Sequence, residues 1–212
     1  MFAGTPPLEA NKILLSLAVT EGIGFRTGHR RSGMKIDFLD ACRAYYHANA
    51  TRTVYVQLPE GDREPGMCGR LIKSLQGTRD AAQNWEAAYT AFLVQQGFTA
   101  NRAAPGVFYH IDRNIRLVVH GDDFTILAYE TELDWFFQLI STEFSMKHRG
   151  RIGPGDADSK MIKLLNRVIE WTDVGINYEA DERHADIIVQ GLGLSSESRG
   201  LSATGEVVAT IG

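Results

Sequence analysis

The sequence has few cysteines and no long apolar run. Only Cys42 and Cys68 occur among its 212 residues, which excludes a disulfide framework and a zinc cluster built from thiolates. No apolar stretch approaches the roughly 20 residues that a membrane-spanning helix needs. Residues 1–7 lack a basic segment followed by an apolar one, so we expect no secretory signal. With 44% hydrophobic and 23% charged residues, the composition predicts a globular protein in a reducing compartment.

A basic excess is also missing. Lysine and arginine number 22 against 26 acidic residues, which gives a net charge of −4. Because surfaces that bind nucleic acid are usually basic, this balance alone disfavours a broad nucleic-acid interface. The balance varies along the chain: residues 1–50 carry six basic and four acidic side chains, and residues 151–212 carry six and ten.

Apolar periodicity and turn residues predict a mixture of helices and hairpins. Helices are expected at residues 8–19, 81–96 and 133–144, with a last helix capped by Asp181. Strands are expected at residues 36–46, 53–58, 115–119, 124–127 and 161–171, the last turning at 172–174 into a strand at 175–178. Loops are expected at residues 21–34 and 150–158. This order favours an α+β fold with a mainly antiparallel sheet.

Two adjacent acids, Asp122 and Asp123, lie between the apolar strands 115–119 and 124–127. One interpretation is an ordinary Gly-Asp turn with solvated carboxylates. The other is a metal site, because two-metal phosphoryl transfer needs carboxylates from separate elements. Asp37 and Asp40, near the end of another apolar segment, are the candidates for a third carboxylate.

Several ordered blocks carry a family resemblance. They are T-P-P-L-E-A at residues 5–10, D-A-C-R-A-Y-Y at 40–46, V-Y-V-Q-L-P-E-G at 54–61, G-R-L-I-K-S-L-Q-G-T-R-D-A-A-Q-N-W at 69–85, G-F-T at 97–99, P-G-V-F-Y at 105–109, H-G-D-D at 120–123 and L-L-N-R-V-I at 164–169. In order and spacing they resemble the reverse transcriptase (RNA-directed DNA polymerase) domain of copia-type retrotransposon Pol polyproteins. Counting back from Val54 makes Asp40, rather than Asp37, the equivalent of the first catalytic aspartate.

The resemblance implies a role for each matching residue. Catalytic residues and ligands of Mg²⁺, with Mn²⁺ as the substitute ion, would be Asp40, Asp122 and Asp123. The nucleotide-binding residues would be Tyr45 as a steric gate against ribose, Lys73, Gln76, Gly77 and Arg79. His120 and Gly121 would lie near the primer end. Tyr45 has an alternative interpretation as a core residue, Lys73 and Arg79 have one as solvated charges, and Trp85 fits the apolar stripe of a helix better than a base-stacking platform.

The chain also departs from the family pattern. His120 and Gly121 replace a tyrosine and an apolar residue before the acidic pair, and Asn166 replaces a glycine. The resemblance implies a polymerase palm-like domain with truncated fingers. Residues 1–150 would form this palm with a remnant of the fingers and a loop insertion at about 21–35. Residues 151–212 would form a post-palm hairpin and helix near the connection or thumb, with a loose tail.

The resemblance predicts an RNA-directed DNA polymerase. Its partners would be an RNA or DNA template-primer, dNTPs and the remaining Pol domains, integrase and RNase H, with no membrane. We expect a cytoplasmic retroelement particle as its location, with access to the nucleus, and no secretion. The alternative is a catalytically inactive Pol fragment that acts at most as a nucleic-acid-binding or structural remnant. The basic segment 26–31 is equally compatible with nucleic-acid contact and with a disordered loop.

Overall fold

The computed structural model describes residue 4 and residues 6–164, 167–180, 183–193, 200–201 and 207–209. The described part is an α+β structure with antiparallel sheets, as predicted. No helix within those ranges is long and apolar enough to cross a membrane.

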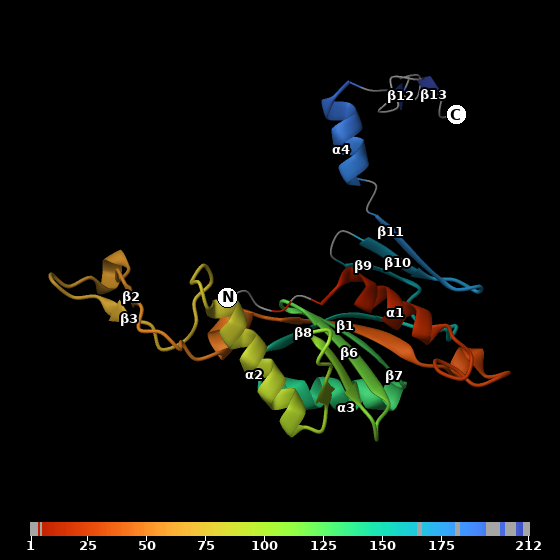
Figure 1. Cartoon of the computed structure of the whole chain (residues 1–212), viewed down its shortest axis with the longest axis horizontal. Helices are drawn as coiled ribbons and strands as arrows, with labels where there is room; N and C mark the ends of the chain where they lie inside the picture. Colours follow the sequence, from red (N-terminus) through yellow and green to blue (C-terminus); the bar gives the residue numbers. More distant parts are fainter. Residues whose placement is uncertain are drawn as a thin grey trace.

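A six-stranded antiparallel sheet forms the centre of the molecule (Figure 1). Its strands, in spatial order, are β4 (Thr99–Ala100), β5 (Val107–His110), β6 (Ile115–His120), β7 (Asp123–Ala128), β1 (Lys35–Ala41) and β8 (Met146–Ile152). Strand β1 therefore lies between β7 and β8, although β7 and β8 come far later in the sequence. This arrangement brings the end of β1 beside the β6–β7 turn.

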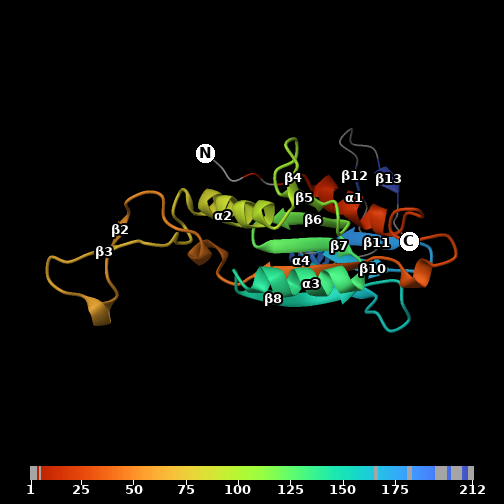
Figure 2. The ribbon, with the colours of Figure 1, turned by 90° about the horizontal axis from the view of Figure 1, so that it is seen from below.

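The two faces of the sheet carry separate hydrophobic cores. Helices α2 (Ala81–Gln95) and α3 (Glu130–Ser141) cover one face, and α1 (Leu8–Ala18) covers the other together with strands β9–β11 (Figure 2). Because neighbouring side chains of a strand point to opposite faces, Leu39 of β1 packs toward α2 and α3, and Phe38 packs toward α1. The apolar spacing at Trp85, Tyr89 and Leu93 is buried as the periodicity predicted.

A long arm extends from the sheet between residues 50 and 73 (Figure 2). It follows the 3-10 helix η2 (Ala44–His47) and contains β2 (Tyr55–Val56), the 3-10 helix η3 (Glu60–Asp62) and β3 (Gly69–Arg70). We predicted a strand over residues 53–58, but only Tyr55 and Val56 pair, with Arg70 and Gly69. The prediction was too long because the arm lies away from the central sheet, and β3 offers only two residues for pairing.

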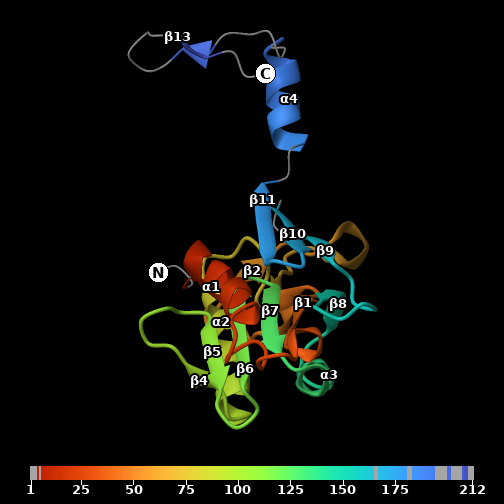
Figure 3. The same ribbon diagram turned by 90° about the vertical axis from the view of Figure 1, so that its right-hand side faces the viewer.

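The C-terminal part adds a three-stranded sheet and a helix. The elements are β9 (Met161–Leu164), β10 (Arg167–Trp171), β11 (Ile176–Ala180) and α4 (Arg183–Gly191) (Figure 3). They are followed by β12 (Gly200–Leu201) and β13 (Val207–Ala209). The hairpin turn is confirmed, because the Thr172 N–H donates to the Gly175 carbonyl at 2.8 Å. The single strand predicted over 161–171 is two strands instead. The expected cap Asp181 and the departure Asn166 lie outside the described residues.

Strand β8 was missed by the sequence analysis, which placed residues 150–152 in a loop. Its sequence, M-K-H-R-G-R-I, shows no clear apolar alternation, because β8 is an edge strand with exposed cationic side chains. Strand β8 extends across the predicted boundary between residues 1–150 and 151–212. The remaining 3-10 helix, η1 (Arg30–Ser32), lies in the predicted loop before β1.

Candidate active site at the end of the central strands

The structure brings the candidate aspartates to one end of the central sheet. Asp40 near the end of β1 is directly opposite Asp123, the first residue of β7. The Ala41 N–H donates to the Asp122 carbonyl at 2.8 Å, which ties the end of β1 to the β6–β7 turn. Directly opposed residues of antiparallel strands have side chains on the same face. The carboxylates of Asp40 and Asp123 therefore lie side by side, with the exposed Asp122 next to them.

A two-residue turn fixes the position of the acidic pair. His120 ends β6 and is opposite Asp123, so Gly121 and Asp122 form the turn. Gly121 has φ +67°, a left-handed conformation that glycine adopts readily and that suits the first position of a tight hairpin turn.

The side chain of Trp85 is hydrogen-bonded to the backbone of this turn. Its ring is buried in the core on α2, as predicted, and its Nε1–H donates to the Gly121 carbonyl at 2.8 Å. The Trp85 ring also packs edge-on against Phe124 of β7 and against Phe144. The indole thus connects helix α2 to the backbone of the acidic turn, a role that the apolar periodicity of α2 did not reveal.

The cation at the site is Arg149, which sequence reasoning missed. Its Nη2 donates to Asp40 Oδ1 at 2.7 Å. Strand β8 pairs with β1 through a register shift: His148 is opposite Leu39 and Gly150 is opposite Phe38, so Arg149 has no partner on β1. Such a bulge re-aims a side chain. Arg149 lies two residues after Lys147, which is opposite Asp40, and so shares the face of Asp40, whereas the extra residue places Arg151 opposite Asp37.

Electrostatic repulsion within the site acts on Asp123. Burial raises the pKa of the Asp123 carboxyl to about 6, and the neighbouring charges of Asp122 and Asp40 add to the increase. Arg149 and His120 act in the opposite direction. Burial and the neighbouring carboxylates thus disfavour the charged form of Asp123, and a cation bound beside it would favour that form.

Asp37, the other acid of β1, has a different environment. It is buried on the opposite face and accepts two hydrogen bonds from Arg151, at 2.5 Å and 2.9 Å. Arg151 also binds Asp134 of α3 at 2.7 Å. Asp37 is thus part of an ion-pair network that joins β1, β8 and α3, and it does not share a face with Asp40.

The nucleotide-binding candidates lie on the segments that follow β1 and the arm. Tyr45 is half-buried on η2 and packs against the core beneath the sheet. Lys73 is exposed, and its Nζ donates to the carbonyl of His47, the last residue of η2, at 3.3 Å. Gln76, Gly77 and Arg79 are exposed on the loop before α2. None of the contacts among the described residues joins these three to the aspartates.

The donor set suits a hard divalent cation, because carboxylate oxygens are the ligands that Mg²⁺ and Mn²⁺ prefer. Within the part of the chain that the structure describes, however, no group of three or more His, Cys, Asp or Glu side chains is arranged to hold a metal ion. Asp40 contacts Arg149 instead. The residues thus fit the metal by their chemistry, while their side chains do not form a complete ligand set.

Comparison with known proteins shows the family. Residues 8–154 match the family described as reverse transcriptase (RNA-dependent DNA polymerase). A relative, the retrovirus-related Pol polyprotein from transposon TNT 1-94 of Nicotiana tabacum, is 27% identical over 124 residues, which cover 55% of this chain and 9% of the polyprotein. The family match covers more than half of the chain and includes all three candidate aspartates. The chain therefore belongs to the reverse transcriptase family and is a reverse transcriptase domain of the copia retrotransposon type.

Proposed function

We propose that this domain is the palm of an RNA-directed DNA polymerase that transfers a nucleotide from a dNTP to a primer 3′-hydroxyl. Reverse transcriptases are nucleotidyltransferases, so the family supplies the enzyme class. The observation that carries the proposal is the register of β1 and β7, which sets Asp40 directly opposite Asp123 at the acidic turn. Two-metal chemistry needs carboxylates from separate elements at one point, and the opposed positions of Asp40 and Asp123 support such a site.

In this proposal Asp40, Asp122 and Asp123 hold two Mg²⁺ ions. When bound, such a pair lowers the barrier by stabilising both the attacking and the leaving oxygen. The chain's own contribution is the fixed position of the carboxylates. The backbone hydrogen bond from Ala41 to Asp122 and the bond from Trp85 to Gly121 hold the turn against the end of β1. His120 and Gly121 are proposed to lie near the primer end.

We propose that the segments after β1 bind the incoming nucleotide. Tyr45 would exclude a ribose 2′-hydroxyl, and its place four residues beyond β1 supports this role. Lys73 is tied to the same region through the carbonyl of His47, so its charge is available for a phosphate. Gly77 has φ +90° with open space around it, which permits close approach of a ligand to the backbone. Gln76 and Arg79 flank it.

The template-primer is the proposed macromolecular partner. Exposed cations on the returning strand of the arm and after it, Arg70, Lys73 and Arg79, suit contacts with phosphates. The surface that carries these three cations therefore differs from the chain as a whole, whose net charge is −4. The remaining Pol domains are further proposed partners, because the relative is a Pol polyprotein, and the proposed setting is a cytoplasmic retroelement particle.

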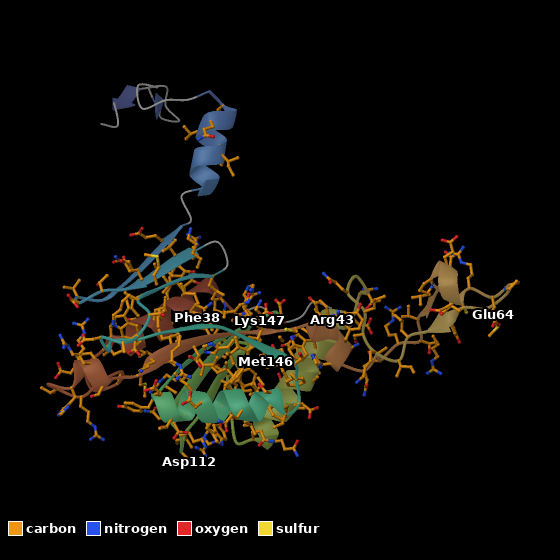
Figure 4. The ribbon with its side chains drawn as sticks, turned by 180° about the vertical axis from the view of Figure 1, so that it is seen from behind. Phe38, Arg43, Glu64, Asp112, Met146 and Lys147 are labelled. Atoms are coloured by element: carbon orange, nitrogen blue, oxygen red, sulfur yellow. The ribbon has the colours of Figure 1, made fainter. Side chains whose placement is uncertain are left out.

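Extension of a DNA primer on an RNA template tests the proposal. Asp122→Asn should reduce extension about a hundredfold or more, because even outer-shell partners of metal sites cost 10–100-fold when they are changed. Asp112→Asn is the matched control, since Asp112 is an exposed aspartate in the β5–β6 turn, remote from Met146 and Lys147 of β8 (Figure 4). Equal extension by the two variants would contradict the metal assignment.

One observation favours a second candidate, an inactive Pol fragment that binds nucleic acid without synthesis. Arg149 holds the carboxylate of Asp40, and the described side chains form no complete ligand set. This candidate predicts that the domain binds a template-primer and that extension is undetectable at any Mg²⁺ or Mn²⁺ concentration. Extension that depends on Asp122 would exclude it.

A further inference from the structure

The bulge in β8 separates two arginines that would otherwise share a face. Residues 149 and 151 are two positions apart, and in a regular strand their side chains would point the same way. The extra residue in β8 places Arg151 on the face of Asp37 and Arg149 on the face of Asp40. The geometry of β8 therefore places the guanidinium of Arg149 at the candidate metal site.

We propose that Arg149 is a built-in counter-cation that competes with the divalent metal for Asp40 and must turn away before the ligand set can form. The inference rests on the proposed function, because it takes Asp40 as a metal ligand. It assigns Arg149 as a positioning residue that sets how tightly the site binds metal.

The contact between Arg149 and Asp40 is one that a bound metal ion can displace. Arg149 makes one hydrogen bond to Asp40, and its side chain is 46% exposed. Asp40 keeps its second oxygen, Oδ2, free of Arg149. Since Arg149 has no partner on β1, its side chain can rotate into solvent while the β1–β8 pairing remains. Arg151, by contrast, makes two hydrogen bonds to the buried carboxylate of Asp37 and is not free to rotate away from it.

The charges around Arg149 support the same conclusion. The guanidinium interacts electrostatically with Asp122 and Asp123 as well as with Asp40. The one positive charge of Arg149 therefore faces three carboxylates. A divalent cation would bring more charge and could contact several of the carboxylates at once, so it would replace Arg149 at Asp40.

Binding of Mn²⁺ alone to the 212-residue chain, without nucleotide or nucleic acid, tests the competition. The concentration of free Mn²⁺ is measured from its paramagnetic resonance signal. Arg149→Gln should bind Mn²⁺ about fivefold more tightly than the wild type, because a half-exposed ion pair contributes up to about 1 kcal/mol. Combining it with Asp40→Asn should abolish the gain.

Lys147→Gln is the matched control. Lys147 lies on the same strand, is opposite Asp40 in the register and makes no ion pair among the described residues. It loses the same charge, so it corrects for the change in net charge. Its Mn²⁺ affinity should rise less than that of Arg149→Gln, because Lys147 lies beside Asp40 in the register but makes no ion pair with it among the described residues.

The outcomes separate the inference from the proposed function. Equal affinities of wild type, Arg149→Gln and Lys147→Gln, with binding still lost in Asp40→Asn, would overturn the competition and leave the metal site standing. Weaker binding by Arg149→Gln would overturn it as well, since Arg149 would then support the site. If neither wild type nor Arg149→Gln shows binding that depends on Asp40, the metal site of the proposed function fails too. If Arg149→Gln does not fold, Arg149→Lys serves in its place. A lysine lacks the planar guanidinium group, so this variant should still bind Mn²⁺ about twofold more tightly than the wild type.

Discussion

Two aspartate–arginine pairs join β1 to β8, only three residues apart along β1, and their surroundings differ. Asp37 is 1% exposed and Arg151 19%, and two hydrogen bonds connect them. Asp40 is 17% exposed and Arg149 46%, and one hydrogen bond connects them. The first pair lies between the sheet and α3, whereas the second lies at the end of the strands beside two further carboxylates. The same two residue types thus form a buried ion pair that stabilises the fold in one place and an accessible charge cluster in the other.

The difference shows why a carboxylate's neighbours decide its role. Arg151 is shared among Asp37, Asp134 and Glu130, which are held by the packing of α3. Removing the buried Asp37 there leaves Arg151 with only two partners that are more than half exposed. At Asp40 the neighbours include the carboxylates of Asp122 and Asp123 as well as Arg149, so this cluster is suited to a further cation. We therefore expect losses of stability at Asp37 and losses of activity at Asp40.

The largest difference in stability should come from breaking the two pairs separately. Asp37→Asn should lower the free energy of unfolding by about 3–5 kcal/mol, because it leaves Arg151 partly uncompensated in a buried site. Asp40→Asn should change it by less than about 1 kcal/mol, since its pair is half-exposed and its loss relieves repulsion. Urea unfolding without divalent cations measures both. Equal losses would remove the distinction between the pairs.

Trp85→Phe should affect the Asp40 region and leave the Asp37 pair intact. It deletes the hydrogen bond to the Gly121 carbonyl and part of a buried ring, so the free energy of unfolding should fall by about 2 kcal/mol. Primer extension should fall beyond what this loss of folded protein explains, because the acidic turn is no longer tied to α2. Trp135→Phe, on α3 and stacked on Arg113, is the control. If both variants retain the same specific activity, the turn does not depend on Trp85.

Gly150→Ala tests the bulge that keeps the two arginines apart. Gly150 has φ +156°, and an added Cβ would lie 3.1 Å from Ile162 Cδ1. Strain and contact together should reduce the free energy of unfolding by about 1.5 kcal/mol. Gly175→Ala, where the added Cβ meets open space, should be close to neutral. A neutral result at Gly150 would mean that the bulge tolerates a side chain and is not set by the glycine.

The raised pKa of Asp123 gives the smallest predicted effect, on the pH dependence of stability. Its folded-state pKa of about 6 exceeds the usual 3.8, so the folded state binds this proton more tightly. The resulting stability is fully present below about pH 4 and is lost as the pH rises through 6. The stability of wild type relative to Asp123→Asn should therefore fall by about 1 kcal/mol between pH 4 and pH 7, after allowance for solvent screening.

Asp112→Asn, the exposed aspartate at the far end of β6, controls for the removal of one carboxylate. Its stability relative to wild type should not show the fall between pH 4 and pH 7. A constant difference for Asp123→Asn would show that burial and the neighbouring aspartates together do not raise the pKa of Asp123, and that the Asp40 region resembles the Asp37 region more than we infer.

The central elements could be predicted from the sequence because their signals are local. Apolar spacing located α2 and α3, and two apolar runs around H-G-D-D located β6 and β7. The family blocks pointed to Asp40 rather than Asp37, and in the β1–β7 register Asp40 is opposite Asp123 whereas Asp37 is opposite Ile126. The strand at residues 53–58 was predicted too long because its residues suit a strand while the arm offers them little to pair with.

Arg149 and the second role of Trp85 could not be predicted, because both depend on contacts distant in sequence. Nothing in M-K-H-R-G-R-I indicates which arginine faces which aspartate, since the answer depends on one unpaired residue in the β1–β8 register. The hydrogen bond from Trp85 to Gly121 joins residues 36 positions apart, and a tryptophan on an apolar stripe gives no sign of it.

The most direct test is a crystal structure of the domain grown with Mn²⁺, with the ion located by its anomalous scattering. The proposed site predicts a peak within coordination distance of the Asp40 and Asp123 carboxylates, with Arg149 turned away from Asp40 and Arg151 still bound to Asp37. An ion bound elsewhere, with Asp40 still paired to Arg149 at saturating Mn²⁺, would contradict it.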